Sequence, residues 1–431
     1  MSLFEVLAKW NRWGGAMLSG GERRDILSKV RLFLETKEIV VFTGPRRAGK
    51  TTILFQIMDL LTEKGVAPES MLHVNFEEPA FSPHLNVDLL EKIYKNYREN
   101  IFPVGKIYLF LDEIQNVAQW ERWVRARNDT ENIKIFITGS SSKLMSRELG
   151  TLLTGRHISF RVFPLSFKEF LRFEGIESPK QPLLLPARPE VHHALKKYLK
   201  WGGFPEVVIS ENELRKELLL KQYFDDILFK DVAIRHNIRD VMLLRGLAVH
   251  LLTHTASLVS FQRISKLFDV SLDLAHAYCD YLQEAFLIDF LPYYSLKVSE
   301  RNRNPKKIHA IDLGFRQVLT LSNSLDIGHV IETAVYQGLM RQVQDGLFYI
   351  NKGGEIDFVV REGNSVKKLI QVVCGNQDNI ELKPHEISNL NDVAKLFPGS
   401  EKIVVLSHAL GGDDKQKNDV KILPLWRFLL M

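Results

Sequence analysis

A glycine-rich stretch near the N-terminus, GPRRAGKT (residues 44–51), has the residue types and the spacing of a phosphate-binding loop. It follows an apolar run, IVVFT, and precedes a segment whose apolar residues recur at helical spacing, which is the context that such a loop requires. Glycines allow the backbone to wrap around a phosphate, so that several N–H groups and a helix N-terminus point at the anion. The residues that we expect to contact the nucleotide are Gly44, Pro45, Arg46, Arg47, Ala48, Gly49, Lys50, Thr51 and Thr52.

Two side chains of this loop are suited to act on the phosphates. Lys50 would reach the β- and γ-phosphates, and the Thr51 hydroxyl would bind Mg²⁺. A glycine-rich turn without a ligand is the competing interpretation, and the position between a strand and a helix disfavours it. The sequence thus predicts a site for a nucleotide and Mg²⁺. ATP is the expected nucleotide, because no guanine-reading motif stands out further along the chain.

An acid pair should complete this site. The apolar run IYLFLDE (107–113) ends in Asp112 and Glu113. Asp112 is placed to hold Mg²⁺ through water, and a carboxylate directly after the metal-binding acid can orient and deprotonate the attacking water. Together with the loop, the pair predicts hydrolysis, with Glu113 as the catalytic base.

Hydroxyl groups and one arginine are further candidates. The run IFITGSS ends in Thr138, Ser140 and Ser141, which could sense the γ-phosphate or help to place the water, although serine also commonly ends strands. Arg156 precedes the next apolar run. It could act as an arginine finger on the nucleotide of a neighbouring subunit, which would tie activity to a homo-oligomer. An ordinary surface arginine is the equally open alternative.

The elements that position these residues form an α/β pattern. Apolar runs separated by helical stretches indicate buried parallel strands of a P-loop NTPase sheet. These runs are 39–44, 71–76, 106–113, 134–140 and 157–163. Helix signals then dominate from 166 to 320, beginning with Ser166 and Glu169 in capping-box spacing, and part of this region resembles a winged helix. A helix followed by strands returns after 325, so that we expect domains at 1–165, 166–320 and 321–431.

Composition sets broad limits. A chain of 431 residues with 45% apolar and 25% charged residues is typical of a folded protein with more than one domain. No apolar run approaches the roughly 18 residues that a membrane-spanning helix needs, and the N-terminus lacks the pattern of a signal peptide. Only two cysteines occur, which argues against a disulfide framework. We therefore expect a cytoplasmic protein without membrane contact. Its net charge of +5 permits a nucleic-acid partner without demanding one.

Several of these motifs together resemble a known family. They are Gly44–Thr52, LFLDEIQNVAQW (109–120), ITGSSS (137–142), LLTGR (152–156), GGFPE (202–206), FKDVAIRHNI (229–238), KIHAIDLGF (307–315) and HVIETAVYQGL (329–339). The chain is similar along most of its length to the archaeal and bacterial P-loop ATPases of AAA-like type. The resemblance implies an additional-strand sheet, in which the strand ending in ITGSSS lies between the loop strand and the Asp-Glu strand.

The resemblance also concerns the C-terminal part, because many members of the family end in a fold similar to PD-(D/E)XK nucleases. Glu332 and Asp357 stand where the first two acids of such a site would be, but Gln371 and Val373 replace its last acid and its lysine. A neutral ligand weakens Mg²⁺ binding, and valine cannot stabilise developing charge. We therefore expect a catalytically dead nuclease-like domain. In the simplest interpretation, Asp357 caps a turn and Glu332 faces solvent.

A rescued nuclease remains the alternative for this domain. Glu355 could lend a carboxylate and Lys367 or Lys368 a charge, although Lys367 would lie roughly 13 Å from Gln371 along the strand at about 3.3 Å per residue. ATP would then license cleavage.

The preferred function is an ATP-driven switch or motor that acts on a macromolecule, with duplex DNA as the leading partner. Helical segments within 260–288 are consistent with a helix-turn-helix, although a plainly packed helix is the simpler interpretation. The basic residues that could meet phosphates are Arg263, Lys266, Lys297, Arg301, Arg303, Lys306 and Lys307. A protein partner, or ATP binding without turnover, stays open.

Overall fold

The computed structural model describes ten stretches of the chain. They are residues 2–16, 20–142, 155–177, 189–320, 327–343, 345–351, 354–374, 384–407, 415–417 and 419–431. The chain divides into two compact units, Met1–Val162 and Phe163–Met431. The second unit thus contains both regions that the sequence divides near residue 320, and the expected boundary residue 321 lies outside the described residues. The described part contains no helix with the length and apolar character that crossing a membrane requires.

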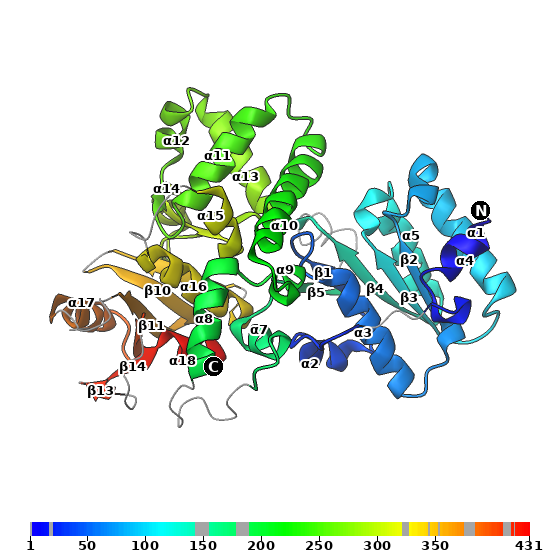
Figure 1. The fold of residues 1–431 in the computed structure, drawn as a ribbon, viewed down its shortest axis with the longest axis horizontal. Helices are drawn as coiled ribbons and strands as arrows, with labels where there is room; N and C mark the ends of the chain where they lie inside the picture. The colour runs from blue at the N-terminus through cyan, green and yellow to red at the C-terminus, as the bar shows by residue number, and fades with distance from the viewer. Residues whose placement is uncertain are drawn as a thin grey trace. The chain divides into compact units, whose positions relative to one another are not determined.

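The first unit is built on one parallel sheet of five strands (Figure 1). In spatial order these are β2 (Met71–Asn75), β3 (Ile107–Asp112), β4 (Ile133–Gly139), β1 (Ile39–Thr43) and β5 (His157–Arg161). Strand β4 pairs with β1 on one side and with β3 on the other. The expected additional-strand order is therefore confirmed.

Helices cover both faces of this sheet because its strands are apolar on both sides. Helices α2 (Leu27–Val30) and α3 (Lys50–Glu63) pack on one face, where β1 presents Val40 and Phe42. The other face, where β1 presents Ile39 and Val41, packs against three helices. These are α1 (Leu3–Ala8), α4 (Val87–Asn100) and α5 (Trp120–Thr130). Short 3₁₀ helices connect these elements in the described residues, among them η1 (Arg12–Gly14), η2 (Arg31–Phe33), η3 (Pro68–Ser70), η4 (Pro79–His84) and η5 (Ile114–Asn116).

The second unit begins with helices, as the sequence predicts. They are α7 (Phe167–Phe173), α8 (Pro189–Trp201), α9 (Pro205–Ile209), α10 (Glu213–Asp226) and the π-helix η7 (Ile227–Ile234). The expected capping box is present at the start of α7. Glu169 N donates to Ser166 Oγ at 3.1 Å, and Ser166 N donates to the Glu169 carboxylate at 2.8 Å. This reciprocal pair satisfies two N–H groups at the first turn.

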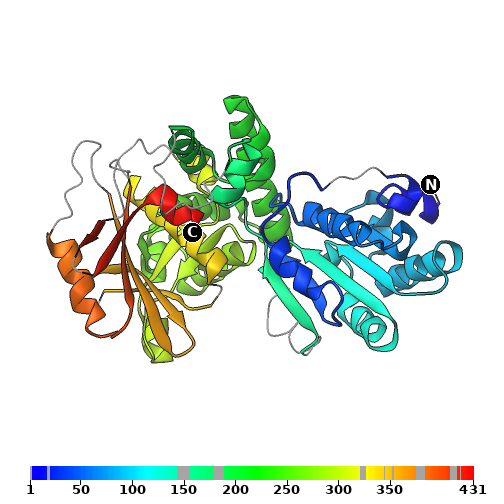
Figure 2. The ribbon, with the colours of Figure 1, turned by 90° about the horizontal axis from the view of Figure 1, so that it is seen from below.

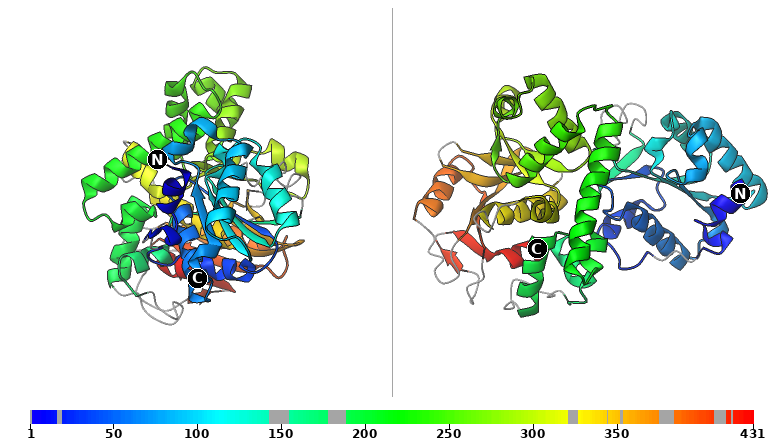
Figure 3. Two further views of the ribbon diagram at one scale, coloured as in Figure 1. Left: turned by 90° about the vertical axis from the view of Figure 1, so that its right-hand side faces the viewer. Right: turned by 45° about the horizontal axis from the view of Figure 1, so that its top comes forward.

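A small sheet of three strands, with helices before, between and after its strands, follows in the chain (Figure 3). In order, the elements are α11 (Val241–Thr253), β6 (Leu258–Val259), α12 (Phe261–Leu267), α13 (Leu272–Glu284), β7 (Ile288–Leu291), α14 (Val298–Arg303), β8 (Lys306–Ala310) and α15 (Leu313–Leu319). The strand order is β6-β8-β7, with antiparallel pairing throughout. Strand β8 begins with Lys306 and Lys307, two of the basic residues that we expect to meet phosphates.

A mixed sheet of six strands ends the second unit (Figure 2). Its elements are α16 (Ile327–Gln342), β9 (Leu347–Ile350), β10 (Ile356–Glu362), β11 (Ser365–Val373), α17 (Pro384–Ala394), β12 (Glu401–Leu406), β13 (Lys415–Lys417), β14 (Val420–Pro424) and α18 (Leu425–Leu430). Strands β9, β10 and β11 are antiparallel neighbours, whereas β12 runs parallel to β11. The spatial order is β13-β14-β12-β11-β10-β9.

Candidate functional site

The glycine-rich loop lies between the end of β1 and the start of α3 (Figure 1). A Cβ atom on Gly44 would lie 2.1 Å from the carbonyl oxygen of Val162, so that only glycine fits where the chain leaves β1. Gly49 has φ 94° and Arg47 has φ 64°, and both are therefore in the left-handed region. The loop turns sharply here before α3 begins at Lys50, and this is the path that wraps backbone around an anion.

Lys50 is buried beneath this loop. Its ammonium group donates to the carbonyl oxygens of Gly44 and Pro45, both at 3.1 Å. Glu113 Oε1 lies 3.3 Å from the same Nζ atom. The structure therefore brings the lysine of the loop and the second acid of the Asp-Glu pair together.

Asp112 accepts hydrogen bonds from two threonines. Thr51 Oγ1 donates to Oδ2 at 2.7 Å, and the Thr138 hydroxyl donates to Oδ1. Complete burial raises the pKa of Asp112, but neighbouring His73 and the hydroxyls of Thr138 and Thr51 outweigh it, so that the pKa is lowered. The carboxylate is thus held ionised beside the hydroxyl of Thr51.

Glu113 sits in a left-handed backbone conformation, with φ 53°. Its N–H donates to Thr138 Oγ1 at 2.9 Å, so that one threonine orients both acids. Gln115 Nε2 donates to Glu113 Oε2 at 2.6 Å and lies 3.4 Å from Ser140 Oγ. Ser140 is fully buried and joins the cluster through Gln115.

Other loop residues have contacts of a different kind. Arg46 forms an ion pair with Glu77, which follows β2. Arg47 is exposed, and Pro45, Ala48 and Thr52 carry no charge that could reach phosphate. Their expected contribution is the backbone path itself.

Arg156 and the glycine-rich loop lie at opposite ends of the strands of the sheet. The carbonyl oxygen of Arg156 accepts from the N–H of Ile39, the first residue of β1, whereas Gly44 follows the last residue of that strand. The five residues of β1, at about 3.3 Å each, separate these two ends. The guanidinium donates to Asp129 at 2.6 Å instead. Arg156 is therefore not part of the cluster in its own chain. The preceding residues of LLTGR, 152–154, lie outside the described residues.

The structure adds residues that the sequence does not single out. Arg24 donates from Nη1 to the carbonyl oxygen of Ala48 at 2.7 Å, which fastens the N-terminal segment to the loop. Gln56 Oε1 accepts from Arg24 N at 3.1 Å. His73 on β2 is completely buried, with Nε2 3.8 Å from Asp112 Oδ2. No spacing rule could have indicated these contacts, because they join separate elements.

A second polar cluster lies in the C-terminal sheet. Asp357 Oδ2 accepts from Gln371 Nε2 at 2.8 Å and from Val372 N at 2.9 Å. Lys307 Nζ lies 2.9 Å from Asp357 Oδ1 and 3.0 Å from Glu332 Oε1. Both acids are buried, so the interpretation in which Asp357 caps a turn and Glu332 faces solvent is wrong.

Lys307 also requires a correction to the expected DNA-binding set. Its side chain is 3% exposed and is bound by carboxylates, so that it cannot meet the phosphates of a nucleic acid. Adjacent strand residues point to opposite faces, which is why Lys306 differs from it and lies over the ring of Phe290. Glu355, which could lend a carboxylate in the alternative of a rescued nuclease, lies 3.4 Å from Lys307 Nζ, whereas Lys367 is exposed.

Comparisons with known proteins show which parts of the chain are similar to described families. A family model described as "AAA domain" matches residues 36–171, and a "Domain of unknown function (DUF8612)" matches residues 192–326. An uncharacterized protein of Methanocaldococcus jannaschii is 32% identical over an alignment of 422 residues, and the match covers 93% of this chain and 90% of that protein. An uncharacterized protein of Haemophilus influenzae is 30% identical over 380 residues, 87% of this chain and 90% of that protein.

Among solved structures, the ORC1 protein of Aeropyrum pernix in complex with DNA is similar at a TM-score of 0.34 and 12% identity. The match covers 72% of this chain and 96% of that chain.

Proposed function

Because this chain belongs to one family with its M. jannaschii and H. influenzae relatives and carries the AAA domain of an ATPase, we propose that it couples ATP hydrolysis to a conformational change that acts on duplex DNA. The observation that carries this proposal is the convergence at the end of β1. Lys50 lies 3.3 Å from Glu113, and Thr51 lies 2.7 Å from Asp112. A charged donor, a base, and two oxygen ligands stand together there.

Each of these groups receives a role. The N–H groups of residues 44–52 and the N-terminus of α3 would surround the phosphates, with Lys50 neutralising their charge. Thr51 and Asp112 offer a hydroxyl and a carboxylate, the hard oxygen donors that suit Mg²⁺, which would offset phosphate charge when it is bound. Glu113 would take a proton from the attacking water, and Ser140 would help to position Gln115 beside it.

The small sheet supports a DNA partner. Its elements follow the order helix–strand–helix–helix–strand–helix–strand, with the first strand beside the third, which resembles a winged helix with one additional helix, α14, between the last two strands. Helix α13 presents exposed Asp273 and Asp280, which repel phosphate. We therefore place the DNA contact on the basic segment between β7 and β8, where Arg301 and Arg303 lie in the last turn of α14.

We further propose that the C-terminal sheet has the fold of PD-(D/E)XK nucleases without their activity. The order helix α16, three antiparallel strands, helix α17 and a parallel strand supports the fold. The amide of Gln371 and the ammonium of Lys307 beside Asp357 support the loss of activity.

The test is Mg²⁺-dependent ATP hydrolysis by the wild type and by Glu113→Gln, with and without duplex DNA. Loss of a general base lowers the rate by about 10²–10⁴-fold, whereas ATP binding should persist. DNA should raise the wild-type rate. Equal turnover by Glu113→Gln would contradict the role of the base, and a rate that does not respond to DNA would point to a protein partner instead.

A further inference from the structure

Three elements of the second unit meet at one buried ammonium group. Lys307 extends from β8, Glu332 from α16 and Asp357 from the start of β10. The Nζ atom lies 3.0 Å from Glu332 Oε1 and 2.9 Å from Asp357 Oδ1. Lys307 is 3% exposed, Glu332 8% and Asp357 5%. Buried charges at this depth are stable only when they are paired, and here a single cation bridges two anions.

The hydrogen bonds of Asp357 show that its carboxylate has no need of another ligand. Oδ1 accepts from Lys307, and Oδ2 accepts from the Gln371 amide and from Val372 N. An acid at position 371 would repel Asp357 unless a divalent cation lay between them, whereas an amide donates to it directly. Gln371 and Lys307 thus both stabilise Asp357, one as a neutral donor and the other as a cation.

The electrostatics of the cluster agree with a permanently charged lysine. Burial lowers the pKa of Lys307, but Asp357 and Glu332 outweigh it, so that the pKa is raised. Burial and the nearby charge of Asp357 raise the pKa of Glu332.

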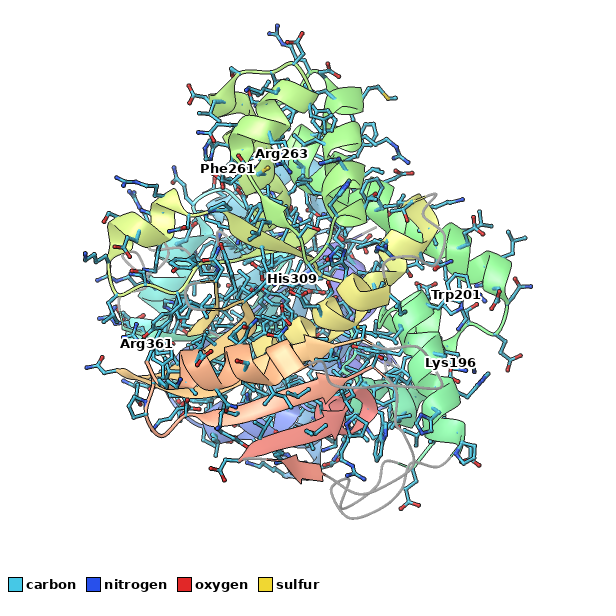
Figure 4. All side chains as sticks on the ribbon, turned by 90° about the vertical axis from the view of Figure 1, so that its left-hand side faces the viewer. Lys196, Trp201, Phe261, Arg263, His309 and Arg361 are labelled. Carbon is cyan, nitrogen blue, oxygen red and sulfur yellow. The ribbon has the colours of Figure 1, made fainter. Side chains whose placement is uncertain are left out.

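The strand that supplies the lysine is fastened to α16 along its length. The Gln337 amide donates to the carbonyl oxygens of Ala310 and Ile311, both at 3.1 Å. The His309 ring stacks on Tyr336 with 4.0 Å between centroids, and Figure 4 shows His309 beside α16. The ion cluster is the charged end of this contact between the three-stranded sheet and the six-stranded one.

We propose that Lys307 is the resident cation of a former metal site, and that its ammonium group fastens the three-stranded sheet to the C-terminal sheet. A Mg²⁺ ion needs its oxygen ligands at about 2.0–2.1 Å and would overlap the ammonium in this position. The inference rests on the proposed nuclease-like fold of the C-terminal sheet, and it does not depend on ATP hydrolysis or on DNA binding.

The experiment makes two measurements on the full chain without nucleotide. The first is the thermal unfolding midpoint with and without Mn²⁺. The second is the binding of Mn²⁺, followed by electron paramagnetic resonance. The proteins are the wild type, Lys307→Met, Asp357→Asn and the double variant Lys307→Met/Asp357→Asn. Lys306→Met is the matched control, because it removes the neighbouring lysine of the same strand. The side chain of Lys306 lies over the ring of Phe290 and not in the buried ion cluster.

We expect the wild type and Asp357→Asn to bind Mn²⁺ equally. Lys307→Met should have a thermal unfolding midpoint several degrees lower than that of Lys306→Met, and it should bind one additional Mn²⁺. Addition of Mn²⁺ should raise the midpoint of Lys307→Met part of the way back. The double variant should lose the additional Mn²⁺.

Three results would overturn the inference. The first is Mn²⁺ binding by the wild type that depends on Asp357, since the lysine would then yield to a metal. The second is an unfolding midpoint of Lys307→Met equal to that of Lys306→Met. The third is a destabilised Lys307→Met that does not respond to Mn²⁺, which would refute the equivalence with a metal ion. If Lys307→Met does not fold, the comparison of the wild type with Asp357→Asn still decides.

Discussion

Thr51 and Asp112, the two expected Mg²⁺ ligands, bind each other: the hydroxyl donates to Oδ2 at 2.7 Å. The residues are 61 positions apart in the chain, and the parallel sheet brings them together at one edge. Because Asp112 is expected to hold Mg²⁺ through water, the Thr51 oxygen can bind the ion with a lone pair while its O–H still donates to Asp112.

This relationship predicts the effect of removing the hydroxyl. Thr51→Ala should lower Mg²⁺-dependent ATP hydrolysis by at least about 10-fold, and higher Mg²⁺ should restore part of it. Thr51→Ser keeps the hydroxyl and should retain most of the activity. A steady-state titration of Mg²⁺ at fixed ATP separates the two variants. Equal Mg²⁺ requirements for both would argue against Thr51 as a ligand.

Gly44 should tolerate no side chain. Because a Cβ atom would lie 2.1 Å from the Val162 carbonyl oxygen, Gly44→Ala should destabilise the first unit by about 2–4 kcal/mol and abolish ATP binding. Gly65→Ala is the control, since Gly65 has φ 85° with nothing within 4 Å and should cost only about 1 kcal/mol. Urea unfolding and nucleotide titration measure both effects. Normal ATP affinity in Gly44→Ala would show that the loop can move aside.

Arg156 is predicted to act on a neighbouring subunit, because in its own chain it lies at the end of the strands that is opposite to the glycine-rich loop. Arg156→Ala should lower turnover by about 10³-fold without loss of ATP binding. A mixture of Arg156→Ala with Glu113→Gln should recover activity, since each contributes the group that the other lacks. Arg125→Ala, which removes a second arginine beside Asp129, is the control and should leave turnover unchanged. A mixture without recovery would assign Arg156 to the surface.

Asp312 should make stability depend on pH. Burial raises its pKa to about 6, although the N–H groups of Gly203 and Gly314 bind the carboxylate at 2.7 and 2.9 Å. The folded state therefore holds a proton more tightly than the unfolded state does. Stability from this group is full below about pH 4 and is lost as the pH rises through 6, by on the order of 3 kcal/mol.

Asp312→Asn removes this titration. The difference in unfolding free energy between wild type and variant should therefore shrink from pH 4 to pH 7 in urea denaturation. Asp273→Asn, which removes an exposed carboxylate of the same unit, controls for the loss of one charge. A difference that grows with pH would mean that the ionised carboxylate is the favoured form.

DNA affinity should depend on the basic residues of α14 and on the first residue of β8. Replacing Arg301, Arg303 and Lys306 by glutamine should weaken duplex binding, and should lower the slope of log affinity against log salt by up to about 3. Lys307 is not part of this set, because its side chain is buried. Fluorescence anisotropy at several salt concentrations measures both quantities.

A charge-matched control comes from the first unit. Glutamine at Lys64, Lys92 and Lys95, which are exposed, removes the same charge at another surface. An equal loss of affinity in both triple variants would indicate attraction by net charge alone.

The nucleotide loop and the elements around it could be predicted from the sequence because their signals are local. Gly44 to Thr51 are consecutive, and an apolar strand before them and a helical pattern after them lie within about twenty residues. Asp112 and Glu113 end an apolar run in the same way. The capping box of Ser166 and Glu169 depends on a spacing of three residues. Each of these features follows from the backbone geometry of one turn or one strand.

The partners of these residues were decided only by the tertiary structure. Thr138 meets both acids because β4 lies beside β3, and His73 approaches Asp112 because β2 lies on the other side. Lys307 stands in a basic stretch that is typical of an exposed surface, yet its side chain is buried. It contacts Asp357, which is 50 positions further along the chain. A strand turns alternate side chains to opposite faces, so which of two adjacent lysines is buried depends on register and packing. The sequence determined which groups could do chemistry, and tertiary packing decided which of them are paired, buried or free to act.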